Sequence, residues 1–254
     1  MINGLNIDGK REKNMTENNC LPTDGKKFFL IIPVFNEKKT IGEIIRRADA
    51  ALAPDYQKEI IVVDDGSADG TEEILENLKG KFSFTLIKHR ENSGKGAAIK
   101  TALKHLTDGV ALIQDADLEY DPADYRVLLE NFNPIQTPVV YGSRNLLARQ
   151  KGNFFYLWGG KFLTALFNFL YGTRLTDLNT GYKLFRTDIL QKANLESDGF
   201  EFCEEITAKA ARSGYPIKEV PVHYQPRKFS AGKKINVWDG LVGIWAILKY
   251  RWKK

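Results

Sequence analysis

The sequence of 254 residues is long enough for one sizeable core, and its 43% hydrophobic and 27% charged residues match an ordinary globular protein. This balance excludes a disordered, fibrous or multispan membrane protein. The formal net charge of +5 favours an anionic partner, such as a nucleotide or a phospholipid, without choosing between them. The sequence holds no recognised nucleic-acid-binding motif, so we expect no nucleic-acid partner.

Two cysteines and three histidines without close spacing predict neither a disulfide framework nor a zinc site. Cys20 lies in a polar stretch and Cys203 in a predicted helix, which favours a reducing, cytoplasmic compartment. Residues 1–27 contain no apolar run, so they predict a flexible polar N-terminal tail rather than a signal peptide. No later stretch is long and apolar enough to predict a transmembrane helix.

From residue 28 onward, short apolar runs alternate with stretches of helical periodicity. The predicted strands are 28–34, 59–63, 84–88, 110–114 and 139–141, and the predicted helices are 36–52, 69–78, 97–106 and 122–132. Helix-length connections imply parallel strands, so we predict an α/β domain over residues 28–235, with a mostly parallel central sheet flanked by helices. Such sheets bind ligands beyond the carboxyl ends of their strands.

Two further segments are rich in apolar and aromatic residues. Residues 154–171 predict an apolar helix whose polar residues Lys161, Thr164 and Asn168 fall on one narrow stripe. Residues 236–254 predict a C-terminal amphipathic helix with basic residues crowded at its end. Its apolar face holds Trp238, Leu241, Trp245, Leu248 and Trp252. Such helices suit a membrane interface, and the alternative is packing within this protein or against a partner.

Acidic residues follow the predicted strand 110–114. Asp115 and Asp117 project to the same side, so they can share a hard divalent cation or divide between a cation and a ribose. Mg²⁺ or Mn²⁺ fits such oxygen ligands together with substrate phosphates, and it would neutralise charge on a departing diphosphate. Glu119 lies where it could add another oxygen. The alternative is a loop whose carboxylates are simply solvated.

Two other segments suit a nucleotide. Asp65 follows the strand 59–63, where a carboxylate can accept an N–H of uracil or guanine; helix capping is the alternative. The sequence NSGKG at 92–96 lacks the Walker A spacing, but its backbone N–H groups and Lys95 can contact a phosphate. A plain glycine turn before a helix is the alternative for that loop.

Basic residues supply further candidates for phosphate binding. Arg144 follows the strand 139–141, and arginine forms forked contacts with phosphate oxygens. Arg227 and Lys233 belong to a basic segment around Gly232 that could close over a diphosphate. The alternative for this segment is a solvated run of charge.

Taken in order, these motifs resemble those of the inverting glycosyltransferases of family 2, which have the GT-A fold. The motifs are IIPVFNE, VVDDGSADGT, NSGKGAA, QDADLEYDP, YGSR, DLNTGYKLFR and YQPRKFSAGKK. The resemblance spans about residues 28–240 and is greatest to the dolichol- and polyprenyl-phosphate mannose or glucose synthases. It implies inverting transfer of mannose or glucose from a GDP- or UDP-hexose to a polyprenyl phosphate, with Mg²⁺ or Mn²⁺ as cofactor.

The resemblance also implies roles for individual residues. The nucleoside of the donor would contact Pro33, Phe35, Glu37, Val63 and Asp65. Its ribose and diphosphate would contact Asp115, Ala116 and Asp117. The metal ligands would be Asp117 and Glu119, although the family often has glutamine at the second position. The remaining donor-binding residues would be Lys95, Arg144, Lys183, Arg227 and Lys233. Of these, the two arginines and Lys233 could bind the acceptor phosphate instead. The acceptor region would contain Asp177, Asn179 and Gly181.

In the implied reaction Asp115 and Asp117 act at the donor, and an ionised lipid phosphate attacks without needing a general base. If the acceptor is instead a hydroxyl group, Asp177 is the candidate base. One alternative is therefore a family-2 enzyme with a saccharide or other hydroxyl acceptor. Another is a non-catalytic nucleotide-sugar-binding scaffold at a membrane. We expect a cytoplasmic protein held peripherally at a membrane surface, and the sequence leaves its oligomeric state open.

Overall fold

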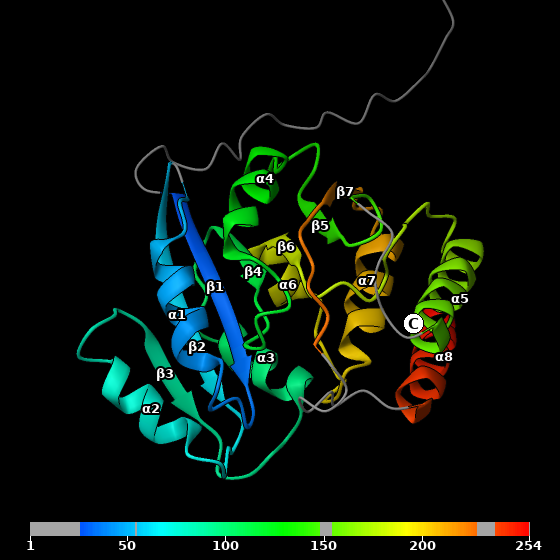
Figure 1. Ribbon diagram of the computed structural model, residues 1–254. Helices are drawn as coiled ribbons and strands as arrows, with labels where there is room; N and C mark the ends of the chain where they lie inside the picture. Colours follow the sequence, from blue (N-terminus) through cyan, green and yellow to red (C-terminus); the bar gives the residue numbers. More distant parts are fainter. Residues whose placement is uncertain (1–25, 54, 148–153, 228–236, 254) are drawn as a thin grey trace, which may run out of the picture.

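The computed structural model describes residues 26–53, 55–147, 154–227 and 237–253, within which seven strands form one sheet. Their order across the sheet is β3-β2-β1-β4-β6-β5-β7 (Figure 1). The strands are β1 (Lys26–Val34), β2 (Tyr56–Asp64), β3 (Thr85–Lys88), β4 (Val110–Ile113), β5 (Val139–Ser143), β6 (Lys183–Arg186) and β7 (Ile217–Pro221). β6 runs antiparallel to β4 and β5, and the other pairs are parallel. The predicted mostly parallel α/β sheet is thus confirmed.

Helices cover both faces of this sheet. They are α1 (Ile41–Ala50), α2 (Thr71–Leu78), α3 (Lys95–Leu103), α4 (Tyr125–Glu130) after a 3-10 turn (Pro122–Asp124), α5 (Phe154–Tyr171), α6 (Thr187–Lys192), α7 (Phe202–Arg212) and α8 (Val237–Trp252). Helices α1, α2 and α4 pack on one face, and α3, α6 and α7 pack on the other. The result is a three-layer arrangement with an apolar core on each side of the sheet.

Strand β1 shows why its sequence is a continuous apolar run. Phe28, Leu30 and Ile32 enter the core under α1, whereas Phe29 and Ile31 enter the core under α3. Side chains alternate along a strand, and helices cover both sides of this strand, so every position from Phe28 onward is apolar. The central position of β1 brings the ends of β2 and β4 to either side of its own carboxyl end.

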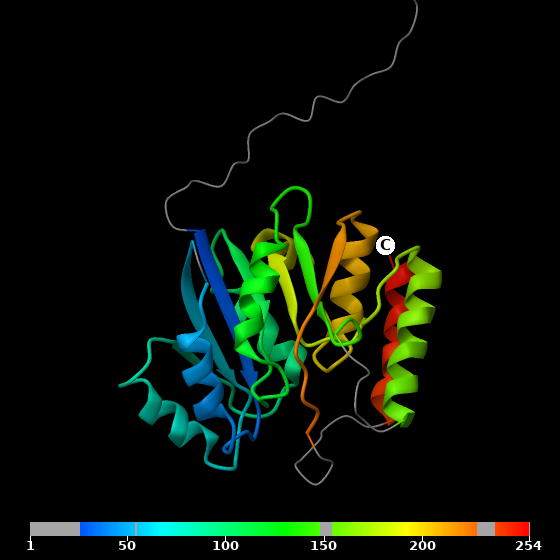
Figure 2. The ribbon, with the colours of Figure 1, turned by 45° about the horizontal axis from the view of Figure 1, so that its top comes forward.

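Helices α5 and α8 form a pair at the edge of the molecule, beyond α7 (Figures 1 and 2). Leu163 of α5 lies at Gly243 of α8, and the hydroxyl of Tyr171 donates to the carbonyl of Ile247 at 2.8 Å. Residue numbers therefore rise together along the two helices, which means that they run in the same direction. No helix in the described residues is long and apolar enough to cross a membrane.

The polar stripe predicted for α5 faces the protein at two of its three positions. Thr164 is buried, and its hydroxyl accepts the backbone N–H of Leu178 at 3.2 Å. The side-chain oxygen of Asn168 accepts the backbone N–H of Leu175 at 2.9 Å, and its amide donates to the Leu175 carbonyl at 2.8 Å. The outward side of α5 instead carries large aromatic side chains: Trp158, Phe162 and Phe169. The polar side of this helix is therefore its inner side.

The described boundaries differ from the predicted ones in a few places. Strand β1 begins at Lys26, two residues before the predicted strand, and α1 begins at Ile41 rather than at residue 36. Asn36 has a positive φ of 50°, so the chain turns there before the helix starts. Strands β6 and β7 were not predicted. The predicted boundary at residue 235, and most of the predicted N-terminal tail, lie outside the described residues.

Candidate active site

The carboxyl ends of β1, β2 and β4 lie side by side and carry the acidic motifs. Beyond the last paired residues, the N–H of Asp65 donates to the carbonyl of Val34 at 2.8 Å. The N–H of Gln114 donates to the carbonyl of Ile31 at 2.9 Å. These bonds extend the sheet into the loops, so the segments after β2 and β4 are fixed on either side of β1. Asp65 and the Asp115–Asp117 segment are thereby brought to one edge, as predicted.

The carboxylate of Asp65 is 3% exposed and holds the loop that follows β3. Its Oδ1 lies 2.7 Å from Nδ1 of His89 and accepts the backbone N–H of Ser93 at 3.0 Å. Its Oδ2 accepts the N–H of Gly94 at 2.8 Å. Nε2 of His89 lies 2.9 Å from the hydroxyl of Thr101 on α3. Sequence reasoning missed His89 and Thr101, whose only signal is their place on either side of the NSGKG motif.

The other residues expected at the nucleoside differ in accessibility. Pro33 pairs in register with Val63, and Val63 is 0% exposed within the core under α3. The structure therefore does not bring Val63 to the surface, because its side chain is needed to fill the sheet–helix interface. Phe35 is partly exposed after the end of β1. Glu37 is nearly buried, and its backbone N–H donates to the hydroxyl of Thr71 at 3.0 Å.

The acidic segment after β4 is surrounded by cations and donors. Lys95, at the start of α3, forms an ion pair with Oδ1 of Asp115. Burial disfavours the charge of Lys95, but the neighbouring Asp115 outweighs it and raises the lysine pKa. Oδ1 of Asp117 accepts the backbone N–H of Glu119 at 3.0 Å. Ala116, between the two aspartates, is buried. Lys95 thus neutralises one aspartate, and Asp117 depends on other partners.

Those partners come from the segment that follows β7. Nη2 of Arg227 donates to Oδ2 of Asp117 at 3.0 Å, and its Nη1 donates to both carboxylate oxygens of Glu37 at 3.0 and 3.1 Å. Glu119 accepts the hydroxyl of Tyr224 at 2.6 Å and the backbone N–H of Arg227 at 2.9 Å. The acidic segment therefore fixes residues 224–227 across the sheet edge.

The chemistry of this cluster suits a magnesium or manganese ion. Burial, with Asp115 and Glu119 close by, raises the pKa of Asp117 to about 7, so its ionised form lacks sufficient compensating charge. Across residues 26–53, 55–147, 154–227 and 237–253, no three acidic, histidine or cysteine side chains are already arranged as a metal cage. Asp117 and Glu119 could hold an ion whose remaining ligands are phosphate and water oxygens, the usual manner of Mg²⁺.

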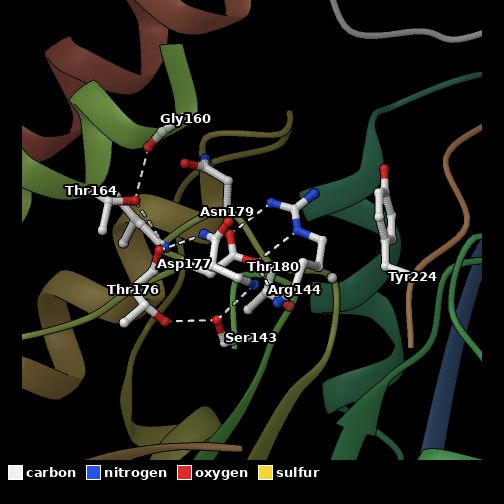
Figure 3. Close-up of polar contacts among 12 residues, drawn as sticks. Ser143, Arg144, Gly160, Thr164, Thr176, Asp177, Asn179, Thr180 and Tyr224 are labelled. Carbon is white, nitrogen blue, oxygen red and sulfur yellow. Dashed lines mark hydrogen bonds and ion pairs between the residues drawn. The ribbon is translucent and has the colours of Figure 1, made fainter. Parts of the chain in front are cut away.

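A second cluster surrounds Arg144 (Figure 3). Nε and Nη2 of Arg144 donate to Oδ2 and Oδ1 of Asp177, each at 2.7 Å, and its backbone N–H donates to Oδ2 at 3.0 Å. The guanidinium also lies 5.1 Å from the ring centroid of Tyr224. Oε2 and Oε1 of Glu219 on β7 accept the backbone N–H groups of Thr176 and Asp177 at 2.6 and 2.9 Å. Arg144 is therefore held on a rigid frame that includes Glu219 and Tyr224, which sequence reasoning missed.

The two clusters are in contact through Tyr224 and Gly181. The ring of Tyr224 lies beside Arg144 while its hydroxyl bonds Glu119. A Cβ atom on Gly181 would lie 2.5 Å from Oδ2 of Asp115, so only glycine lets this strand end approach the acidic segment so closely. The predicted donor and acceptor motifs are thereby adjacent in space.

Asn179 and Lys183 lie on the inner side of this region. The amide of Asn179 donates to the buried carboxylate of Glu204 on α7. Lys183 is fully buried, its Nζ donates to the carbonyl of Leu178 at 2.7 Å, and burial lowers its pKa. The ammonium group of Lys183 is thus used inside the fold, and its contact with the donor stays a prediction. The predicted residue Lys233 lies outside the described residues.

The fold is that of the GT-A glycosyltransferases. Glucosyl-3-phosphoglycerate synthase from Mycobacterium tuberculosis, solved with UDP, superimposes with a TM-score of 0.68 over 89% of this chain and 80% of its own, at 19% identity. A mannosyltransferase from Pyrobaculum calidifontis, solved with GDP-Man and Mn²⁺, gives a TM-score of 0.57 over 82% of this chain and 59% of its own, at 20% identity. At these identities the likeness shows the fold alone.

Sequence comparison adds the family. Residues 29–193 match the family described as glycosyl transferase family 2. A polyprenol monophosphomannose synthase from Mycolicibacterium smegmatis is 27% identical over 241 residues, which cover 90% of this chain and 89% of that protein. An uncharacterized protein of Methanocaldococcus jannaschii is 30% identical over 233 residues, covering 84% of this chain and 88% of its own. The chain belongs to glycosyltransferase family 2, and it is a glycosyltransferase.

Proposed function

We propose that this enzyme transfers mannose or glucose from a GDP- or UDP-hexose to a polyprenyl phosphate, with inversion at the anomeric carbon. The observation that carries the proposal is the position of Arg144. Its guanidinium lies beside Tyr224, whose hydroxyl donates a hydrogen bond to the acidic segment. Its ion-pair partner Asp177 lies in a loop that is hydrogen-bonded to α5. An anion-binding arginine therefore lies between a donor-type acidic cluster and a helix with an aromatic outer side.

On the donor side, Asp65 and Glu37 would bind the nucleoside, and Asp115, Asp117 and Arg227 would contact the ribose and the diphosphate. A divalent cation on Asp117 and Glu119 would supply compensation for the negative charge that develops on the diphosphate. The residues themselves would hold the donor in place. Lys95 orients Asp115 through their ion pair.

On the acceptor side, Arg144 would bind the phosphate of the lipid. One phosphate oxygen attacks the anomeric carbon, the bond from that carbon to the diphosphate breaks, and the nucleoside diphosphate leaves from the opposite face. Both oxygens of Asp177 accept hydrogen bonds from Arg144, so this carboxylate orients the arginine rather than waiting to accept a proton. That arrangement favours an acceptor already ionised, and it favours the phosphate over a hydroxyl group.

The comparisons support the classes of donor and acceptor in this proposal. One relative is a polyprenol monophosphomannose synthase, and solved structures of the same fold contain UDP or GDP-Man with Mn²⁺. A panel of donors incubated with polyprenyl phosphate and Mn²⁺ or Mg²⁺ tests the proposal. Mass spectrometry of the lipid fraction is expected to reveal one hexosyl phosphate lipid. Sugar found only on a water-soluble acceptor would favour the hydroxyl alternative, and no transfer from any donor would refute the proposal.

The outer side of the α5–α8 pair would hold the enzyme at the membrane. Five residues of α8 with apolar side chains are at least 40% exposed, beside the aromatic outer side of α5: Trp238, Leu241, Val242, Trp245 and Trp252. The basic residues Lys249, Arg251 and Lys253 lie near the end of the same helix. Apolar side chains that enter the interface and basic groups that meet anionic headgroups are the features of a peripheral helix.

We expect the double substitution Trp245→Ser and Trp252→Ser to weaken binding to vesicles of anionic phospholipid by at least about tenfold. The reason is that burying one large apolar side chain is worth about 1.5–3 kcal/mol. A sedimentation assay with sucrose-loaded vesicles measures the bound fraction. The control Leu52→Ser with Ile135→Ser removes two exposed apolar side chains elsewhere and is expected to bind as the unmodified protein does. Equal loss in both double variants would contradict a role for α8.

We expect His89→Ala to raise the KM for the donor about tenfold with a smaller change in kcat. The substitution removes a donor to the Asp65 carboxylate, and a hydrogen bond to a charged group contributes about 1.5–3 kcal/mol. Calorimetric titration with UDP and GDP measures the same loss directly. His89→Asn retains an N–H donor and should recover part of the affinity, while the exposed His105→Ala serves as control. Unchanged nucleotide affinity in His89→Ala would show that Asp65 needs no such support.

A further inference from the structure

Arg227 occupies the centre of the acidic cluster. Its guanidinium bonds Glu37 through Nη1 and Asp117 through Nη2, while its backbone N–H bonds Glu119. These three carboxylates come from the loop after β1 and from the segment after β4, so the contact joins parts of the chain far apart in sequence. The Arg227 side chain is 19% exposed, and its Nε is buried without a hydrogen-bond partner, 3.7 Å from Oε1 of Glu119.

The contact involves the same oxygens that a divalent ion would use. Oδ2 of Asp117 accepts from Nη2 of Arg227, and both oxygens of Glu119 accept from the segment 224–227. An ion on Asp117 would lie against a guanidinium of the same sign of charge. Repulsion between like charges at such short range is strong in a partly buried site. The arginine and the ion therefore exclude each other from Asp117 in this arrangement.

Among the residues that the structure describes, the cluster nevertheless holds more carboxylates than cations. Glu37, Asp115, Asp117 and Glu119 are four carboxylates, and the cations that pair with them in the described residues are Lys95 and Arg227. If Arg227 turned to another anion, the deficit would grow by one charge. A diphosphate is such an anion, and arginine prefers the forked contacts that phosphate oxygens offer.

We propose that Arg227 is an internal counter-cation that competes with the divalent metal for Asp117. The metal then binds weakly to the enzyme alone and tightly once a nucleoside diphosphate offers Arg227 another partner. This inference rests on the proposed function, because it takes Asp117 as a metal ligand and Arg227 as a phosphate contact. It goes further by assigning the order of events: donor and metal bind cooperatively, and the residue responsible for the cooperativity is Arg227.

Metal binding to the full chain without nucleotide tests the competition. The signal of free Mn²⁺ in electron paramagnetic resonance gives its affinity for the unmodified protein, Arg227→Ala, Arg227→Lys and Arg126→Ala. The apparent affinity of a site is reduced by the fraction of molecules in which it is open, so a site closed about 90% of the time binds about tenfold more weakly. We expect Arg227→Ala to bind Mn²⁺ about tenfold more tightly than the unmodified protein.

The two other variants separate direct contact from a general effect of charge. Arg126→Ala removes an exposed arginine that pairs with Glu130 on α4, and it should bind Mn²⁺ as the unmodified protein does. Arg227→Lys keeps the charge, but lysine cannot contact two carboxylates with a planar fork. Its Mn²⁺ affinity should therefore lie between that of the unmodified protein and that of Arg227→Ala. Affinity of Arg227→Lys equal to the unmodified protein would overturn the proposal, as would no gain in Arg227→Ala.

Added UDP or GDP gives the second measurement. In the unmodified protein the nucleotide should increase Mn²⁺ affinity more than it does in Arg227→Ala, where nothing remains to be released. Equal increases in both would also overturn the proposal. Failure of the donor panel would refute the proposed function but leave the nucleotide-free difference in Mn²⁺ affinity intact. An active enzyme whose variants all bind Mn²⁺ alike would overturn only the present inference. Thermal melting in EDTA shows which variants fold, and Arg227→Lys replaces Arg227→Ala if the latter does not.

Discussion

Asp117→Asn is expected to lower kcat for sugar transfer by about 10³-fold or more while the protein remains folded. The substitution keeps an oxygen that can accept the N–H of Glu119, but it removes the negative charge that a divalent ion requires. Loss of one preorganised electrostatic contact with a developing charge typically costs a factor of about 10²–10³, and a weakened metal adds to this loss. Initial rates at saturating donor and Mn²⁺ measure the effect.

Stability measurements distinguish lost chemistry from lost folding in this variant. The pKa of Asp117 in the fold is raised to about 7, whereas an unfolded aspartate titrates near 4. The ionised carboxylate therefore lowers stability above pH 7, and that penalty disappears as the pH falls through 7 towards 4. In EDTA at pH 8, Asp117→Asn should be at least as stable to urea as the unmodified protein, with a difference that shrinks at lower pH.

Asp121→Asn provides the matched control for this experiment. Asp121 accepts the N–H of Ala123 at the start of the 3-10 turn, and asparagine can accept the same bond. Its substitution removes a neighbouring negative charge without touching Arg227 or the acidic cluster, so rates should change by less than about threefold. Activity of Asp117→Asn near that of the control would show that this carboxylate does not hold the metal.

Asp177→Asn is expected to raise the KM for the acceptor by about 10²-fold, with a smaller fall in kcat at saturating acceptor. Asparagine leaves the Arg144 guanidinium, whose side chain is 20% exposed, without a full counter-charge, and loss of one partner of a buried pair costs at most about 3–5 kcal/mol. Part of that cost falls on folding, so the melting temperature should fall as well. Rates measured against polyprenyl phosphate concentration separate KM from kcat.

The pH profile shows whether Asp177 orients Arg144 or removes a proton. A positioning role predicts that the profile of kcat keeps its shape in Asp177→Asn, whereas a general base would leave its acidic limb missing from the variant. Ser143→Ala removes a hydroxyl that bonds Thr176 in the same loop but does not touch the Arg144–Asp177 pair, and it serves as the control. An unchanged KM together with a lost acidic limb would contradict the orienting role and support the hydroxyl-acceptor alternative.

Local sequence patterns were enough to predict much of the fold. The runs at β1, β2 and β4 are apolar without alternation because helices cover both faces of the sheet, and that composition is visible without a structure. Strands β6 and β7 escaped prediction for a physical reason. β6 is only four residues long, inside a motif rich in polar residues, and it pairs antiparallel between β4 and β5. Its strand character comes from those neighbours, which no local pattern reveals.

The residues of the site also fall into those that the sequence predicted and those that it did not. Acidic residues at strand ends were predictable because parallel strands place their carboxyl ends at one edge. The partners of those acids were not, since His89 and Tyr224 reach them through contacts between distant segments. Glu219 likewise binds the backbone of the loop around residue 177 from a distant strand. Val63 and Lys183 fall inside the sequence motifs, yet both are fully buried, and only packing shows this. A motif locates a site along the chain, but it does not state which of its side chains reach the surface.

The inward-facing polar side chains of α5 couple the position of this helix to the loop that follows it. The backbone of the loop 173–178 is hydrogen-bonded to this helix at two points. The N–H of Leu178 donates to the hydroxyl of Thr164, and the N–H of Leu175 donates to the side-chain oxygen of Asn168. The same loop supplies Asp177, which grips Arg144. A tilt or slide of α5 would thus act on the loop that carries Asp177, which Glu219 on β7 holds from the other side. A surface that bound the aromatic side of α5 would therefore be connected to Asp177 and Arg144 through these hydrogen bonds.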